Sequence, residues 1–118
     1  MGLDMYLRNR DGAEVAYWRK ANAIHRWFCD RLGIFGNDRS DEWINKEILE
    51  DLLSDCRKVI ENPNEAHVIL PTMDGFFFGD VTYGELYFSN IEQTINQLTN
   101  ILSTFDFDND DLYYEADW

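Results

Sequence analysis

The N-terminal part of the chain changes from strand-like to helix-like spacing. Apolar and polar residues alternate imperfectly over residues 3–7, which predicts a β-strand. Residues 9–12 contain an Asp-Gly pair and indicate a turn, and 14–17 form either a second strand or the approach to a helix. Over 18–32 apolar residues recur at steps of three and four. This range is therefore predicted to be helical, with Gly33 as its C-terminal cap.

Two further helices are predicted downstream. The first begins after Asn45, whose side chain suits an N-cap, and follows a wide apolar stripe to the stop signal at 62–64. The second begins at Ser89, which forms a capping box with Glu92, and keeps helical spacing to Phe105.

The remaining segments predict strands and loops. Residues 75–79, three phenylalanines between two glycines, indicate a buried strand entered and left by turns. Residues 34–41 read as a polar loop, and 112–118 as a final strand that pairs with an N-terminal strand. Helices and strands that do not alternate strictly predict one α+β domain over 1–118, with about three helices packed on a small, mainly antiparallel sheet.

Composition supports a folded domain inside a cell. Apolar residues make up 45% of the chain, which is too many for a disordered protein. Cys29 and Cys56 fit neither a disulfide framework nor a metal motif, so both are predicted to be buried free thiols. The start of the chain lacks the features of a signal peptide, and no apolar run is long enough to span a membrane. We therefore expect a cytoplasmic protein.

Charge is large and unevenly placed. The net charge is −13. Residues 1–39 carry seven basic and five acidic side chains, whereas residues 40–118 carry three basic and 18 acidic ones. A field of this sign repels nucleic acids and anionic membranes and attracts basic partners. We expect no direct binding to nucleic acid, no membrane association, and a basic protein as the partner.

Motifs for catalysis and cofactor binding are missing from the sequence. It contains no G-x-S-x-G, no P-loop, no G-x-G-x-x-G and no H-E-x-x-H. Cys29 lies one helical turn from His25, but a catalytic thiolate needs exposure and positive surroundings. We expect the chain not to be an enzyme, and to need no catalytic residue, metal or cofactor.

The acidic tail matches a calcium-binding loop only in part. Asp106, Asp108 and Asp110 fall at positions 1, 3 and 5 of the EF-hand template, and Asp117 falls at position 12. Asp111 stands where the sharp turn needs glycine, and Asp117 stands where glutamate is typical. The match therefore does not predict a calcium site.

Two interpretations of the tail remain open, a solvated acidic terminus and a surface for protein recognition. Carboxylates held by neighbouring aromatic residues can imitate the regularly spaced phosphates of DNA, and aromatic side chains are good interface anchors. The candidate partner-binding residues are Asp106, Asp108, Asp110, Asp111, Glu115, Asp117, Tyr113, Tyr114 and Trp118.

A second candidate site lies in the first predicted helix. On a helix, Trp18, Asn22 and His25 share one face, and Arg26 follows one turn after Asn22. An aromatic platform beside an amide, an imidazole and a guanidinium can hold a planar or anionic ligand. The alternative is that these rings pack in the core while the basic side chains are solvated. The candidate ligand-binding residues are Trp18, Arg19, Asn22, His25 and Arg26.

Three segments resemble a group of small proteins encoded by phages and prophages. They are Gly2-Leu3-Asp4-Met5-Tyr6-Leu7, the block Tyr17-Trp18-Arg19-Lys20-Ala21-Asn22 with Ile24-His25 and Trp27-Phe28, and Gly75-Phe76-Phe77-Phe78-Gly79. The resemblance implies a phage accessory gene that acts in a bacterial cytoplasm, and it assigns no functional residue. Small acidic phage proteins are often inhibitors of host defence nucleases, including anti-CRISPR proteins.

These observations lead to competing hypotheses. The leading one is an anti-CRISPR-like inhibitor whose acidic, nucleic-acid-mimicking surface binds a basic host protein such as a nuclease. The alternative is a protein that binds or sequesters a small, nucleotide-like ligand through residues 18–26. A structural or regulatory phage protein is a third option, and the sequence leaves open whether the chain is a monomer or a dimer.

Overall fold

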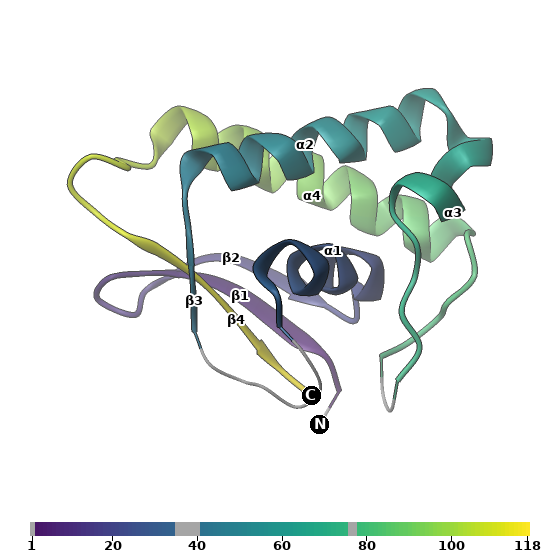
Figure 1. Ribbon diagram of the computed structural model, residues 1–118, viewed down its shortest axis with the longest axis horizontal. Helices are drawn as coiled ribbons and strands as arrows, with labels where there is room; N and C mark the ends of the chain where they lie inside the picture. Colours follow the sequence, from purple (N-terminus) through teal and green to yellow (C-terminus); the bar gives the residue numbers. More distant parts are fainter. Residues whose placement is uncertain (1, 35–40, 76–77) are drawn as a thin grey trace.

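A four-stranded antiparallel sheet with helices packed against one face forms the domain (Figure 1). The computed structural model describes residues 2–34, 41–75 and 78–118. The strands are β1 (Asp4–Asn9), β2 (Glu14–Arg19), β3 (Glu42–Ile44) and β4 (Leu112–Asp117). The helices are α1 (Asn22–Leu32), α2 (Lys46–Glu61), α3 (Ala66–Ile69) and α4 (Glu85–Thr104), and a 3₁₀ turn at Pro63–Glu65 precedes α3. The predicted α+β class is confirmed.

The two ends of the chain meet in the middle of the sheet. The strand order is β2-β1-β4-β3. β1 and β2 form a hairpin whose turn contains Gly12 at a φ of 83°, a conformation that glycine adopts without strain. β4 pairs with β1 along its whole length, from Asp4 opposite Asp117 to Asn9 opposite Leu112. The predicted pairing of the last strand with an N-terminal strand is therefore confirmed.

Alternation along the strands separates a buried face from an outer face. Side chains on one face are buried beneath the helices: Met5, Leu7, Ala16, Trp18, Leu112, Tyr114 and Ala116. Their neighbours along each strand point the other way, as expected for a pleated strand. The aromatic residues of β4 are thus divided, with Tyr114 in the core and Tyr113 on the outer face.

Side chains of α4 cover the open edge of β2. The Tyr17 backbone N–H donates to Gln97 Oε1 at 3.1 Å, and the Tyr17 carbonyl accepts from Gln93 Nε2 at 3.0 Å and Gln97 Nε2 at 3.3 Å. These amides take the place of a neighbouring strand, because they satisfy both backbone groups of an edge residue.

The ends of two predicted helices are confirmed. Asn45 caps α2, because its side chain accepts a hydrogen bond from the Ile48 backbone N–H at 2.8 Å. Gly33 ends α1 in the left-handed conformation at a φ of 71°, with its N–H bonded to the Cys29 carbonyl. α2 and α4 lie side by side above α1 in Figure 1.

Two predicted helix starts were wrong. Trp18 lies on β2, and α1 begins only at Asn22, because Lys20 interrupts the chain with a left-handed φ of 54°. α4 begins at Glu85, one turn before Ser89. Its first turn is held in the core by Tyr87, whose hydroxyl donates to the Leu70 carbonyl at 2.8 Å. Ser89 is therefore inside the helix, and the capping box does not form.

The strand predicted over residues 75–79 was also wrong where it can be seen. Gly75, Phe78 and Gly79 lie in no strand, while residues 76 and 77 are outside the described part of the chain. The Phe78 N–H donates to the Gly75 carbonyl at 3.1 Å. The predicted loop at 34–41 lies mostly outside the described residues.

Of the helices in the described ranges, none has the length and apolar character needed to cross a membrane.

Candidate functional site

Trp18 is a core residue. Its side chain is fully buried on β2, where the indole N–H donates to Thr94 Oγ1 of α4 at 2.8 Å. The ring also packs edge-on against Phe28, with 6.3 Å between ring centroids. A ligand cannot stack on this ring, so the predicted aromatic platform is wrong.

Asn22 holds a loop in place. Its amide nitrogen donates to the carbonyls of Phe78 and Asp80 at 3.0 and 2.9 Å, and its Oδ1 accepts from the Met73 N–H at 3.0 Å. The residue is buried, and these bonds tie Met73, Phe78 and Asp80 to the first turn of α1.

His25 lies in a closed cluster of aromatic and sulfur groups. Its Nδ1 is 2.6 Å from the Tyr114 hydroxyl, and its Nε2 is 3.4 Å from Cys29 Sγ. Burial lowers the pKa of His25 to about 4, so the imidazole is neutral near pH 7. Burial and the nearby Asp30 raise the pKa of the Cys29 thiol to about 11. Near pH 7 the His25 imidazole therefore carries no positive charge, and Cys29 is not a reactive thiolate.

The two arginines of the predicted ligand site point elsewhere. Arg19 lies 3.8 Å from Asp4 on the sheet, and Arg26 Nη1 donates to the Thr72 carbonyl at 2.9 Å. Trp18, Arg19, Asn22, His25 and Arg26 thus do not converge on one ligand position. The expected shared helix face was wrong, because the segment is a strand, a left-handed residue and then a helix.

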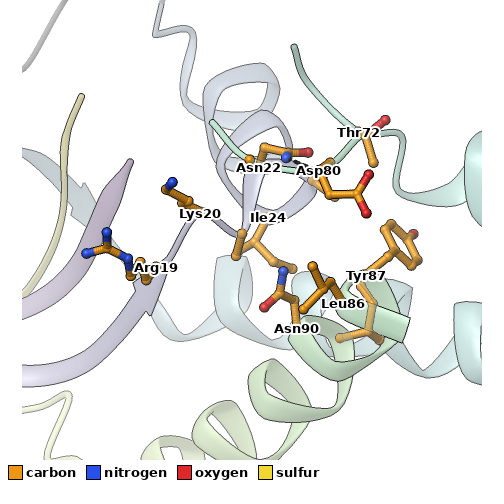
Figure 2. Close-up of a pocket in the computed structure, with 13 residues that line it drawn as sticks. Arg19, Lys20, Asn22, Ile24, Thr72, Asp80, Leu86, Tyr87 and Asn90 are labelled. Atoms are coloured by element: carbon orange, nitrogen blue, oxygen red, sulfur yellow. Dashed lines mark hydrogen bonds between the residues drawn. The ribbon is translucent and has the colours of Figure 1, made fainter. Parts of the chain in front are cut away.

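A cavity lies beside residues 19–24 (Figure 2). It has a volume of about 390 Å³ and lies between the junction of β2 and α1, the residues Thr72, Gly79 and Asp80, and the start of α4. Arg19 and Asn22 are the only residues of the predicted ligand set among its lining residues. Sequence reasoning missed the others that carry polar or exposed groups: Lys20, Thr72, Asp80, Leu86, Tyr87 and Asn90. Lys20 lies within the segment 18–26 that was considered as a ligand site, but no sequence pattern linked it to Asn90, which lies on α4 much further along the chain.

The polar groups around this cavity differ in how they are used. Asn22 bonds to the loop, and Thr72 Oγ1 donates to the Val81 carbonyl at 2.9 Å. Asp80 accepts from Thr82 N and Oγ1 at 2.8 and 2.9 Å, and these bonds lower its pKa. Within the described residues, the side chains of Lys20 and Asn90 make no hydrogen bond or ion pair.

A second hollow, of about 430 Å³, lies between α1 and α2. Its charged side chains neutralise one another or bond to the protein. Arg31 pairs with Asp51 at 2.7 Å, and Asp55 accepts from Trp27 Nε1 at 2.9 Å. This hollow offers fewer unengaged groups than the one beside Lys20.

Much of the predicted acidic interface on β4 is structural. Tyr114 is buried and its ring stacks on Phe28, with 4.1 Å between centroids, so its assignment to a partner surface was wrong. Glu115 pairs with Arg8 at 3.0 Å, and Asp111 pairs with Arg10 at 3.0 Å. Trp118 packs against His25, with 5.1 Å between ring centroids.

The loop between α4 and β4 presents fixed carboxylates, and we call residues 105–111 the acidic loop. Asp106 accepts from the N–H groups of Asp108 and Asn109 and from Asn109 Nδ2, which lowers the pKa of Asp106. Asp110 accepts from the Arg10 N–H at 3.2 Å. The Phe105 and Phe107 rings pack at 4.8 Å and anchor the loop from beneath. Asp108 is exposed at its tip.

Potential metal ligands and thiols were located in the described ranges. There, no group of three or more His, Cys, Asp or Glu side chains is close enough to hold a metal ion. Cys29 and Cys56 are free and buried, as predicted. Burial raises the pKa of Cys56 to about 12.

Comparison with known proteins adds no further constraint: no protein-family model, no curated protein and no solved structure matches the chain.

Proposed function

We propose that this chain is a non-enzymatic inhibitor from a phage accessory gene. It acts in the bacterial cytoplasm, where it binds a basic host protein that handles nucleic acid, such as a defence nuclease. The observation that carries the proposal is the acidic loop. Hydrogen bonds hold the carboxylates of Asp106 and Asp110 in place, and Asp108 is exposed at the tip of the loop, in a chain whose net charge is −13.

The rigidity of the acidic loop favours recognition over simple solvation. Carboxylates that are already fixed lose little conformational freedom on binding, and a fixed array can match a basic cleft that normally receives phosphates. The excess negative charge of the chain speeds encounter with a positive partner, and added salt weakens this effect.

Burial and ion pairs leave fewer of the candidate partner-binding residues available to a partner. Tyr114 is buried, and arginines partly neutralise Asp111 and Glu115. Asp108 becomes the residue to test. It is exposed, and its carboxylate makes no hydrogen bond or ion pair within the described part of the chain.

The test compares two single charge reversals. The tagged protein is purified gently from its bacterial host, the co-purifying protein is isolated, and its nucleic-acid cleavage is assayed with added Asp108→Lys or Glu61→Lys. Glu61 is an exposed acid at the end of α2 and serves as the matched control. We expect Asp108→Lys to weaken inhibition about tenfold, with Glu61→Lys close to the parent.

Salt dependence supplies the second readout. Inhibition by the parent should fall steeply as salt rises, because the interface is electrostatic. Full inhibition by Asp108→Lys, or binding that does not respond to salt, would contradict the proposal.

A further inference from the structure

We infer that the cavity beside Lys20 binds a small organic monoanion with an apolar body. This site is separate from the acidic loop, and the inference does not rest on the inhibitor proposal. The volume of about 390 Å³ is in the usual range for small-molecule sites. Its walls come from three parts of the fold, and Asn22 ties two of them, the start of α1 and the residues around Met73 and Asp80, to each other (Figure 2).

The floor and rim of the cavity favour an apolar body. Ile24 and Ile91 are fully buried beneath it, and Tyr87 is 5% exposed. Leu86 lies at the rim with 64% of its surface exposed, so its side chain offers apolar surface to a ligand. A ligand body lying between Leu86 and the floor removes that apolar surface from water.

Two donor groups favour an anionic head. The Lys20 ammonium and the Asn90 amide lie on different sides of the hollow in Figure 2. Neither side chain has a hydrogen-bond partner within the described residues, whereas Asn22 and Thr72 are already engaged. Both Lys20 and Asn90 can donate to a carboxylate or phosphate oxygen.

Lys20 is fixed at its backbone. Its N–H donates to the Leu3 carbonyl at 2.7 Å, and Gly79 lies so close that a methyl group there would be 3.1 Å from the Lys20 Cβ. The base of the lysine side chain is therefore held between Leu3 and Gly79. Only its outer part moves to meet a ligand.

Asp80 limits the charge of the ligand. Its carboxylate lines the same cavity, away from Lys20 in Figure 2, and Thr82 holds it in the ionised form. A second anionic group near Asp80 would be repelled, and the net charge of −13 disfavours polyanions in general. The site thus fits a hydrophobic carboxylate better than a phosphate monoester or a nucleoside polyphosphate, both of which carry more than one negative charge near pH 7.

Three probes with one apolar body test the assignment: 4-phenylbutyrate, 4-phenylbutanol and 4-phenylbutylamine. Each is titrated into isotope-labelled protein, and amide resonances are followed by NMR. We expect the largest shifts at Ala21–Ile24, Asp80 and Leu86–Ile91. The anion should bind about two- to fivefold more tightly than the alcohol, as a partly exposed ion pair allows, and the amine most weakly.

Variants assign the head group to its donors. Lys20→Gln and Asn90→Ala should each remove the advantage of the anion over the alcohol, while Asp80→Asn should increase it. Lys46→Gln, an exposed cation on α2, is the matched control and should change nothing. Thermal unfolding of each variant separates a lost contact from a lost fold.

The inference is overturned by any of three results. These are equal binding of the three probes, shifts that map outside the cavity, and no cavity shifts for any probe up to its solubility. Because the inhibitor proposal is tested at Asp108, failure of one leaves the other standing.

Discussion

The cluster around His25 and the cavity around Lys20 both include residues of α1, but their polar groups differ in whether they are already engaged. In the cluster, His25, Tyr114 and Cys29 contact one another and are closed off from water. At the cavity, Lys20 and Asn90 face open space. The imidazole of His25, the thiol of Cys29 and the indole of Trp18 therefore stabilise the fold and are not available to a ligand. The groups left for binding are an ordinary lysine and an asparagine.

The largest effect that separates the two regions is expected at Trp18. Trp18→Ala should lower the free energy of unfolding by about 3–5 kcal/mol, since it removes a large buried ring. Urea denaturation measures this, with Lys20→Gln as the comparison on the cavity side, expected within about 0.5 kcal/mol of the parent.

If Trp18→Ala does not fold, Thr94→Val serves in its place. It leaves the indole N–H without its acceptor and should cost about 1–3 kcal/mol. Equal stability of Thr94→Val and the parent would mean that the buried Trp18 indole N–H does not depend on Thr94 as its acceptor.

Asn22 joins the two regions, so its loss should be felt next. Asn22→Ala leaves the carbonyls of Phe78 and Asp80 and the Met73 N–H without partners, and should lower stability by about 1–3 kcal/mol. Hydrogen exchange should show the Met73 amide losing protection while the β1–β4 ladder keeps it. Unchanged protection at Met73 would mean that Asn22 does not hold the loop.

The last of these effects is a dependence of stability on pH that comes from the cluster around His25. The pKa of His25 is about 4 in the folded protein and about 6.5 when unfolded, so the unfolded chain binds the proton more readily. The stability that this provides is complete above pH 6.5 and is lost as pH falls toward 4. Between pH 7 and 5 the loss should reach about 2 kcal/mol.

Denaturation at both pH values, repeated on His25→Asn, measures the histidine contribution by difference. Other titrating groups contribute to parent and variant alike, so the difference isolates one side chain. The same pH dependence in both proteins would mean that His25 is not held neutral.

The sequence predicted the fold where a local signal agreed with the tertiary contacts. Asn45 and Gly33 mark helix ends by their own chemistry, and both were placed correctly. The strand predicted over 112–118 corresponds to β4, in which buried side chains recur at every second residue, as in a half-buried strand. The class of fold followed from these elements.

The prediction failed where tertiary contacts overrode local signals. Ser89 and Glu92 look like a cap, yet burial of Tyr87 extends α4 upstream of them. Trp18 fits a helical stripe and also an inward-facing strand position, and only pairing with Met5 of β1 decides between them. The cavity depends on Lys20, Asp80 and Asn90 meeting in space, and no pattern of spacing in one sequence shows that.

The amides of Gln93 and Gln97 on the edge of β2 also govern how the protein behaves at high concentration. A sheet that grows by adding copies needs two open edges, one to accept a strand and one to offer the next. Here side chains of α4 bond to one of them at Tyr17, and the other edge strand, β3, is only three residues long. Both features disfavour the addition of a strand from a second copy, and with it edge-to-edge stacking of the folded domain.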